Sequence, residues 1–321
     1  MGYRVLLSAP YLLPVIDGFR ALLTSGGVEL LLASVQERLS EDELMAYAGQ
    51  VDGVVCGDDQ FTKRVLEAFS PRLKVISKWG TGIDSIDRQA AERLGIHVGN
   101  TPGAFAHPVG DSVLAYILAF ARRGPWMDQA MKAGHWDKIP GRTLRECTLG
   151  VVGVGHCGRE VLRRARAFGM RLLGNDIVPI PTEFIREVGV EMLSLEELLR
   201  QSDFVSLNCD LNPSSFHLLN GHALARLGPQ AVLINAARGA VVDEQALVEA
   251  LRAGRLAGAA LDVFETEPLP LDSPLMGFDN VLLAPHNANS SPAAWARVHR
   301  NTLRNLFLGL GLPVPAELEI P

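Results

Sequence analysis

Between an apolar stretch at residues 148–152 and a helical pattern at residues 159–168 stands the sequence Gly153-Val154-Gly155-His156-Cys157-Gly158. A Gly-x-Gly-x-x-Gly motif between a strand and a helix is typical of a turn that binds the pyrophosphate of a dinucleotide. Its first glycine forms the tight turn, its second lets the pyrophosphate approach the backbone, and its third allows close packing. Free N–H groups at the start of the helix then hold the phosphates. A glycine-rich turn without a ligand is the alternative, which the flanking strand and helix disfavour.

A carboxylate, Asp176, ends the next expected strand at residues 171–175. In dinucleotide-binding units an acid at this place accepts hydrogen bonds from the ribose hydroxyls of the adenosine half. It would also repel a 2′-phosphate, and residues 177–180 contain no arginine that could receive one. These residues favour NAD over NADP, with an ordinary strand-end Asp that caps a turn as the alternative.

Short apolar runs alternate with helical patterns along the whole chain, which is typical of parallel sheets in α/β proteins. Six strands are expected around and after the glycine motif, and they indicate a doubly wound nucleotide-binding domain. These strands are residues 148–153, 171–175, 204–208, 231–235, 257–261 and 281–284.

The part of the chain before residue 100 has the same rhythm and predicts a first α/β unit. Its expected strands are residues 3–8, 28–33, 53–56, 73–77 and 96–98, and its expected helices include residues 62–69, 84–94 and a helix opened by a capping box of Ser40 and Glu43. A longer helix at residues 110–123 is apolar enough to pack on two sides. A last helix, residues 292–308, lies too far along the chain for the six-stranded unit, so we expect it to return to the first one.

The composition narrows the classes of protein to which this chain can belong. A chain of 321 residues fits two domains, and 48% hydrophobic with 21% charged residues indicates a folded protein. The net charge is −6 and basic residues occur at most in pairs, so nucleic acid and anionic membranes are poor partners. The longest apolar run, residues 113–121, is too short to span a bilayer.

The cysteines and histidines predict no metal site. Cys56, Cys147, Cys157 and Cys209 have no Cys-x-x-Cys spacing, which favours reduced thiols in a cytoplasmic protein, and no secretion signal is expected at the N-terminus. The eight histidines are scattered without metal-ligand spacing.

Three further segments each follow the carboxyl end of an expected strand. They are Asn235-Ala236-Ala237-Arg238-Gly239, Asp262-Val263-Phe264-Glu265-Thr266-Glu267-Pro268 and Ala284-Pro285-His286. The carboxyl ends of a doubly wound sheet form the ligand crevice, so an Arg, a Glu and a His placed there can converge over a bound nicotinamide. Each segment alone could be a plain turn or a capped loop.

These motifs resemble the D-isomer-specific 2-hydroxy-acid dehydrogenase family, which includes phosphoglycerate, glycerate and D-lactate dehydrogenases. The glycine-rich loop, Arg238 in Asn-x-x-Arg-Gly, Glu267 before a proline and His286 after a proline occur in the family's order, and the likeness covers nearly the whole chain. It implies two doubly wound parallel-sheet domains, with a Rossmann NAD-binding domain at residues 99–287. This domain would be inserted into a flavodoxin-like substrate domain built from residues 1–98 and 288–321.

The resemblance also implies an activity, the NAD-dependent interconversion of a D-2-hydroxy acid and its 2-oxo acid. His286 would exchange a proton with the C2 oxygen while hydride passes between C2 and the nicotinamide. Glu267 would be its partner, because a carboxylate beside an imidazole stabilises the protonated ring and raises its pKa. Arg238 would hold the substrate carboxylate and carbonyl through the fixed donors of its guanidinium.

Further ligand-binding residues follow from the same resemblance. The loop Lys78-Trp79-Gly80-Thr81-Gly82 would receive the substrate carboxylate on a nest of backbone amides, with Lys78 facing the substrate. The cofactor-binding residues would be Val109, Gly153, Gly155, His156, Cys157, Gly158, Asp176, Ile177, Cys209, Ala236, Arg238, Asp262 and His286. For Asp262 a plain strand-end acid is the alternative.

The chain departs from the phosphoglycerate enzymes of the family after the strand at residues 53–56. Those enzymes carry a basic residue there, whereas this chain has Gly57, Asp58 and Asp59. Two carboxylates would oppose a phosphate, so we expect an unphosphorylated 2-oxo or 2-hydroxy acid as substrate. By analogy, Trp136 is expected to pack against the cofactor domain. A homodimer is expected with the helix at residues 110–123 as its two-fold contact.

Two other functions remain as alternatives. An NADH-sensing protein resembling the family's corepressors would bind the cofactor with little turnover, whereas the complete set of Arg238, Glu267 and His286 favours an enzyme. Formate oxidation is disfavoured because formate dehydrogenases have Gln where this chain has Glu267. Phosphite oxidation is disfavoured because the loop lysine of that enzyme falls at Thr81.

Overall fold

The computed structural model describes residues 2–319, which form two compact units. The first unit comprises Met1–Phe105 and Ser291–Pro321, and the second comprises Ala106–Ser290. Both are α/β units whose sheets are entirely parallel, so the predicted fold class is confirmed.

The first unit has a five-stranded sheet in the order β2-β1-β3-β4-β5, the strand order of flavodoxin-like folds. Its strands are β1 (Tyr3–Leu7), β2 (Val28–Leu32), β3 (Gly53–Cys56), β4 (Val75–Lys78) and β5 (His97–Gly99). Its helices are α1 (Arg20–Ser25), α2 (Glu41–Met45), α3 (Lys63–Phe69), α4 (Arg88–Arg93) and α12 (Pro292–Gly309), with 3-10 turns at Leu13–Phe19 and Ala316–Leu318.

Local sequence signals account for the ends of these helices. The predicted capping box is present, because the Ser40 side chain accepts from the Glu43 N–H and the Glu43 carboxylate accepts from the Ser40 N–H.

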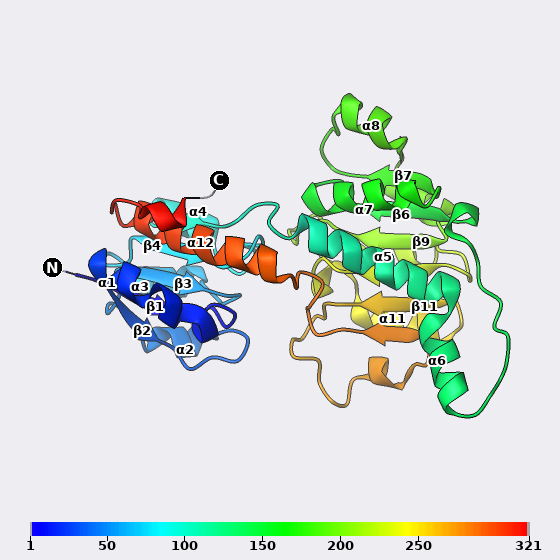
Figure 1. Ribbon diagram of the computed structural model, residues 1–321, viewed down its shortest axis with the longest axis horizontal. Coiled ribbons are helices and arrows are strands. Elements are labelled where there is room, and N and C mark those ends of the chain that lie inside the picture. The colour runs from blue at the N-terminus through cyan, green and yellow to red at the C-terminus, as the bar shows by residue number, and fades with distance from the viewer. Residues whose placement is uncertain (1, 320–321) are drawn as a thin grey trace. The chain divides into compact units, whose positions relative to one another are not determined.

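The helix α12 packs on β3, β4 and β5 and lies beside this blue and cyan part of the chain in Figure 1. A buried hydrogen bond from Ser77 Oγ to the Thr302 carbonyl, 2.6 Å long, fixes that contact.

The second unit has a seven-stranded sheet in the order β12-β11-β10-β9-β6-β7-β8. Its strands are β6 (Thr148–Val152), β7 (Arg171–Asn175), β8 (Glu191–Met192), β9 (Phe204–Leu207), β10 (Val232–Asn235), β11 (Gly258–Leu261) and β12 (Val281–Leu283). Its helices are α5 (Ala106–Arg122), α6 (Gly124–Lys132), α7 (His156–Ala167), α8 (Thr182–Val188), α9 (Leu195–Gln201), α10 (Gly221–Leu224) and α11 (Glu244–Arg252), with 3-10 turns at Leu144–Glu146, Gly239–Val241 and Pro274–Gly277.

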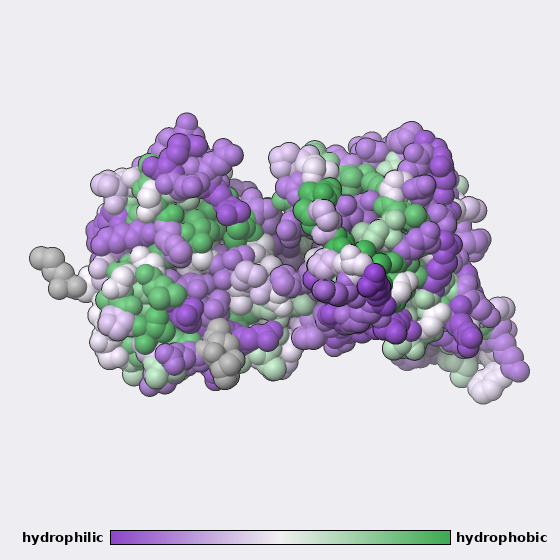
Figure 2. Space-filling model, turned by 90° about the horizontal axis from the view of Figure 1, so that it is seen from above, coloured by the Kyte–Doolittle hydropathy of each residue, from purple (hydrophilic) through white to green (hydrophobic). Residues whose placement is uncertain are grey.

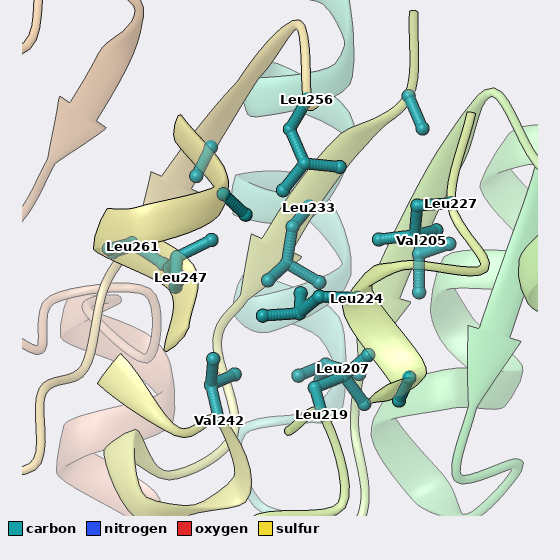
Figure 3. Packing of buried hydrophobic residues seen from close by; sticks show 14 of the residues in the cluster. Val205, Leu207, Leu219, Leu224, Leu227, Leu233, Val242, Leu247, Leu256 and Leu261 are labelled. Carbon is teal, nitrogen blue, oxygen red and sulfur yellow. The ribbon is translucent and has the colours of Figure 1, made fainter. Parts of the chain in front are cut away.

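The core of this unit consists of aliphatic side chains gathered around β9, β10 and β11. Figure 3 shows Val205, Leu233 and Leu261 from these strands with leucines of α10 and α11. Burial of each such side chain stabilises the fold by about 1.5–3 kcal/mol. The core therefore gives the loops at the carboxyl ends of these strands a rigid base.

Three expectations differ from the observed elements. The edge strand β8 was not predicted, because two residues are too few to show an alternating pattern. The helix expected from residue 110 begins at Ala106, since Pro108 is tolerated in a first turn. The expected packing of Trp136 is wrong: its surface is 82% exposed, and residues 133–138 around it are exposed as well.

No helix among residues 2–319 combines the length and the apolar character that a membrane crossing needs. On the face shown in Figure 2, hydrophilic residues predominate and hydrophobic residues form smaller patches between them.

Asp59, one of the two acids that were expected to oppose a phosphate, is an interior residue and not part of a ligand surface. Its carboxylate is fully buried and accepts hydrogen bonds from the Ser8 hydroxyl and, at 2.6 Å, from the Leu39 N–H. Burial raises the pKa of Asp59 to about 6, although both hydrogen bonds favour the charged form. The expectation is therefore corrected for Asp59, whose carboxylate joins the residue after β1 to the loop before α2 and is not exposed to a ligand.

This burial makes stability depend on pH. Because the pKa of Asp59 is raised above its ordinary value of 3.8, ionisation costs the folded state more than the unfolded state. We expect the free energy of unfolding of the wild type, relative to that of Asp59→Asn, to fall by up to about 3 kcal/mol as the pH rises from about 4 to about 7. Urea unfolding of both proteins at several pH values measures this difference. A difference that is constant with pH would contradict it.

Candidate active site

The glycine motif lies between β6 and α7, and its geometry explains two of its three glycines. Gly153 has a φ of +88°, and a Cβ there would lie 2.5 Å from the Cys209 backbone nitrogen. A Cβ at Gly158 would overlap the Gly153 carbonyl oxygen, so α7 can approach the turn only with glycine there. A Cβ at Gly155 would meet no atom within 4 Å. The space at Gly155 suits the approach of a phosphate group to the start of α7.

The two cysteines beside this turn carry unreactive thiols. Cys157 lies in the first turn of α7 and Cys209 follows β9. Burial raises the pKa of each thiol to about 11, so both are neutral at physiological pH and are poor nucleophiles.

Asp176, at the end of β7, is fixed by two backbone groups. Its carboxylate accepts from the Val154 N–H at 2.7 Å and from the Val178 N–H at 3.0 Å. The acid is thus tied to the glycine turn as well as to its own loop. The neighbouring Ile177 side chain is 79% exposed. A contact between Asp176 and a ribose stays a prediction.

Asn235 shapes the turn that presents Arg238. Its buried side chain accepts from the Ala237 N–H at 3.1 Å and donates to the Arg238 carbonyl at 2.9 Å. A Cβ at Gly239 would overlap the Phe264 carbonyl, so this turn packs tightly against the segment that carries Glu267. The sequence motif contained Asn235, but the sequence analysis did not assign it the role of shaping this turn. An Asn at the end of a strand, directly before a turn, was the signal that could have indicated this role.

The side chains of His286 and Glu267 are hydrogen-bonded to each other. His286 Nδ1 lies 2.9 Å from Glu267 Oε2, and the other carboxylate oxygen accepts from the Phe264 N–H at 2.9 Å. The two side chains are 28% and 29% exposed. His286 has a φ of +50°, a left-handed conformation that non-glycine residues adopt mainly where the surrounding structure enforces it.

The buried carboxylate of Asp262 enforces this conformation. It accepts from the Asn287 N–H at 2.9 Å, from the Ala288 N–H at 2.8 Å and from the Tyr116 hydroxyl at 3.3 Å. The Asp262 carbonyl also accepts from the His286 N–H at 2.7 Å. Burial and the nearby Asp262 charge raise the pKa of the Tyr116 phenol, so Tyr116 remains a donor. Sequence reasoning missed Tyr116, because nothing in the helix pattern distinguishes it from its neighbours.

The structure therefore gathers most of the predicted residues at one edge of the second unit. Arg238, Glu267 and His286 follow β10, β11 and β12, whose carboxyl ends share that edge with the glycine turn after β6. His156 is the first residue of α7 and Ala236 lies on the loop after β10, whereas Val109 is buried on α5.

The loop predicted to bind the substrate carboxylate belongs to the first unit. Lys78 ends β4, and its buried ammonium lies 3.1 Å from Asp58 Oδ1 and donates to the Trp79 carbonyl at 3.2 Å. The following loop is held by hydrogen bonds from Asn100 Nδ2 to the Thr81 carbonyl and from Thr81 Oγ1 to the Thr101 carbonyl. Gly80 and Gly82 thus lie in an ordered turn at the end of β4.

In residues 2–319 no group of three or more His, Cys, Asp or Glu side chains is arranged to hold a metal ion.

Comparisons with known proteins agree with this arrangement. Residues 114–288 match the family described as D-isomer specific 2-hydroxyacid dehydrogenase, NAD binding domain. The glyoxylate reductase of Korarchaeum cryptofilum is 40% identical over 78% of this chain and 76% of the relative. The hydroxypyruvate reductase of Thermotoga maritima is 37% identical over 88% and 92%. The D-3-phosphoglycerate dehydrogenase of Methanocaldococcus jannaschii is 38% identical, but the chain spans only 52% of its length.

Solved structures show the same fold over nearly the full chain. The D-lactate dehydrogenase of Aquifex aeolicus, complexed with NAD and lactic acid, has a TM-score of 0.83 at 28% identity and covers 94% of this chain and 93% of its own. A glyoxylate reductase from Paecilomyes thermophila has a TM-score of 0.84 at 29% identity and covers 99% of each chain. With NAD as its cofactor, the chain is an oxidoreductase that interconverts 2-hydroxy acids and 2-oxo acids. It belongs to the D-isomer-specific 2-hydroxy-acid dehydrogenase family.

Proposed function

We propose that Arg238, Glu267 and His286 are the catalytic residues of this dehydrogenase. The observation that carries the proposal is the 2.9 Å contact between His286 Nδ1 and Glu267 Oε2. Because Nδ1 faces the carboxylate, Nε2 is the nitrogen that gives a proton to the C2 oxygen during reduction and takes it back during oxidation. Glu267 orients the ring and stabilises its protonated form.

Arg238 binds the substrate in this proposal. Its guanidinium donates to the substrate carboxylate and to the C2 oxygen, which polarises the carbonyl toward hydride attack. The support is the turn formed by Asn235 and Gly239, which fixes the Arg238 backbone against the segment of Glu267.

The glycine turn and the loops beside it hold the cofactor, whose nicotinamide supplies or accepts the hydride when bound. The backbone of Gly153, Gly155 and Gly158 and the first turn of α7 receive the pyrophosphate, and Asp176 receives the ribose hydroxyls. The open space at Gly155 supports this assignment. The other assigned cofactor contacts are Val109, His156, Cys157, Ile177, Cys209, Ala236 and Asp262.

The substrate is a small unphosphorylated 2-oxo or 2-hydroxy acid, such as glyoxylate or hydroxypyruvate. Support comes from the relatives named glyoxylate reductase and hydroxypyruvate reductase. It also comes from the acidic Asp58, which stands where a phosphate-binding enzyme needs a base. Residues 99–287 form the NAD-binding domain, and residues 1–98 with 288–321 form the substrate domain, whose Lys78, Gly80, Thr81 and Gly82 receive the substrate carboxylate.

The enzyme acts as a cytoplasmic homodimer in this proposal. All four cysteines are free thiols, as suits a reducing compartment. The two-fold contact through residues 110–123 stays a prediction, in which Val113 and Ile117 of α5 take no part because they are buried within the single chain. The exposed side chains of Met127, Met131 and Trp136 offer a surface that a second copy can cover. Sedimentation as a monomer at micromolar concentration would contradict the dimer.

Gly155→Ala tests the cofactor site. The added Cβ meets no protein atom and the φ of −77° suits alanine, so we expect the variant to fold, with a slightly lower melting temperature because alanine is a poorer N-cap than glycine. The methyl group would keep the pyrophosphate from the backbone, so NADH affinity should fall about tenfold or more, measured by fluorescence titration. Gly228→Ala, which also meets no atom within 4 Å, is the matched control. Equal NADH affinity in both variants would refute the role of Gly155.

His286→Gln tests the acid–base role. Loss of the proton donor should lower kcat for 2-oxo acid reduction about a hundredfold or more, with NADH affinity retained. Steady-state rates and NADH titration measure the two quantities separately. Turnover close to that of the wild type would show that another group moves the proton.

Glu267→Gln is the companion variant for that experiment. Its amide keeps an oxygen for the Phe264 N–H but removes the charge beside the imidazole. The protonated ring is then less favoured, so the fall in reduction rate with rising pH should begin about one pH unit lower. A pH profile identical to that of the wild type would separate Glu267 from the acid–base function.

A further inference from the structure

We propose that His217 is a positioning residue of the active site: its backbone holds the Arg238 turn, and its ring holds the segment that carries Glu267. The inference rests on the proposed function, because it takes Arg238, Glu267 and His286 as the catalytic residues. It goes beyond that function, since it gives a residue outside the catalytic set the task of keeping Glu267 against His286.

The backbone at His217 lies along the turn that presents Arg238. The His217 N–H donates to the Ala240 carbonyl at 2.8 Å. Two residues later, the Leu219 N–H donates to the Val241 carbonyl at 3.0 Å. Ala240 and Val241 belong to the 3-10 turn that begins directly after Arg238. These hydrogen bonds therefore fasten the chain around His217 to the Arg238 turn.

The conformation of His217 is an enforced one. Its φ is +48°, close to the +50° of His286, and non-glycine residues rarely adopt this left-handed conformation unless their surroundings maintain it. The Phe216 ring stacks on the His217 imidazole, with the ring centroids 4.1 Å apart and an interplanar angle of 16°. The backbone bond and the stacked ring thus fix where the imidazole points.

The imidazole of His217 reaches Glu265. Its Nε2 lies 2.9 Å from Glu265 Oε1, and this nitrogen donates because an ionised carboxylate can only accept. The same oxygen accepts from the Glu244 N–H at 3.1 Å, and the Glu265 N–H donates to the Glu244 carboxylate at 3.2 Å. Burial and the charge of Glu265 raise the pKa of Glu244, so the two carboxylates repel each other. A donor from His217 offsets this repulsion and stabilises Glu265 in place.

Glu265 lies two residues before Glu267, in a part of the chain that needs such support. Glu265 and Thr266 are exposed, so packing against the core contributes little to their position. On one side of them Phe264 is buried, and its N–H donates to the Glu267 carboxylate at 2.9 Å. The hydrogen bonds of Glu265 to His217 and Glu244 therefore hold the exposed part of the segment, and with it the carboxylate that faces His286.

His217→Leu tests this role, because it removes the ring contact with Glu265 and keeps the backbone N–H that binds Ala240. With Glu267 held less firmly, kcat for 2-oxo acid reduction should fall about fivefold, while KM and NADH affinity stay within about twofold of the wild type. The fall in rate with rising pH should begin about half a pH unit lower, because the protonated His286 ring is less stabilised.

Two further variants separate positioning from a general effect on the fold. His217→Gln keeps a donor for Glu265 and should restore kcat to within about twofold of the wild type, together with the pH profile. His222→Leu is the matched control, because His222 is an exposed histidine of α10 whose ring contacts Arg226 at 3.1 Å. Its kcat and pH profile should equal those of the wild type. If His217→Leu does not fold, Glu265→Ala removes the same contact from the other side.

A double variant shows whether His217 acts through Glu267. In a Glu267→Gln background, His217→Leu should change the rate by less than about twofold, because the charge that it positions is already gone. Effects of the two substitutions that multiply would overturn the positioning role. An unchanged kcat and pH profile in His217→Leu would also overturn it and leave the proposed function intact, whereas a wild-type pH profile in Glu267→Gln would contradict the proposed function itself.

Hydrogen exchange tests the same contact without turnover. The Phe264 N–H, which donates to Glu267, should exchange about fivefold faster in His217→Leu than in the wild type and in His222→Leu, measured by NMR. Equal exchange rates in the three proteins would overturn the positioning role, even if the wild type oxidised NADH with no 2-oxo acid.

Discussion

The buried carboxylate of Asp262 holds together the parts of the second unit on which the chemistry depends. The consecutive backbone N–H groups of Asn287 and Ala288 donate hydrogen bonds to this carboxylate, and the Tyr116 hydroxyl donates a third. Burial of a carboxylate without such donors would destabilise the fold by several kcal/mol. These hydrogen bonds therefore hold the chain after β12 against Asp262. His286 is thereby kept in a left-handed conformation with Nδ1 against Glu267. The strain of that conformation is the consequence of a strong local constraint, as is common at functional sites.

Close backbone contacts connect the segment around Asp262 to the rest of the site. Gly239 brings the Arg238 turn onto the Phe264 carbonyl, and the Phe264 N–H in turn holds the Glu267 carboxylate. Gly158 brings α7 onto the glycine turn in the same manner. The ligand edge of the sheet is thus assembled from short backbone contacts that only glycine permits, while the aliphatic core around β10 supports them from below.

The sequence predicted the elements whose signals are local. The glycine motif stood between a strand and a helix, and Arg238, Glu267 and His286 each came after a predicted strand, so the parallel topology was enough to bring them to one edge. The strand β8 was not predicted because two residues are too few to show periodicity. The packing of Trp136 was predicted wrongly because the residues adjacent to it in sequence do not indicate its neighbours in space. The acids Asp58 and Asp59 looked equivalent in sequence. Only the structure shows that one is buried against Ser8 and the other faces solvent beside Lys78.

With Arg238, Glu267 and His286 in place, the enzyme turns over substrate and does not merely bind the cofactor. A panel of 2-oxo acids incubated with NADH tests it most directly, with the loss of NADH absorbance and the chirality of the product as readouts. Substrate-dependent oxidation of NADH that yields the D-2-hydroxy acid is the predicted result. Tight NADH binding without oxidation by any acid of the panel would contradict the claim and would favour an NADH-sensing protein built on the same fold.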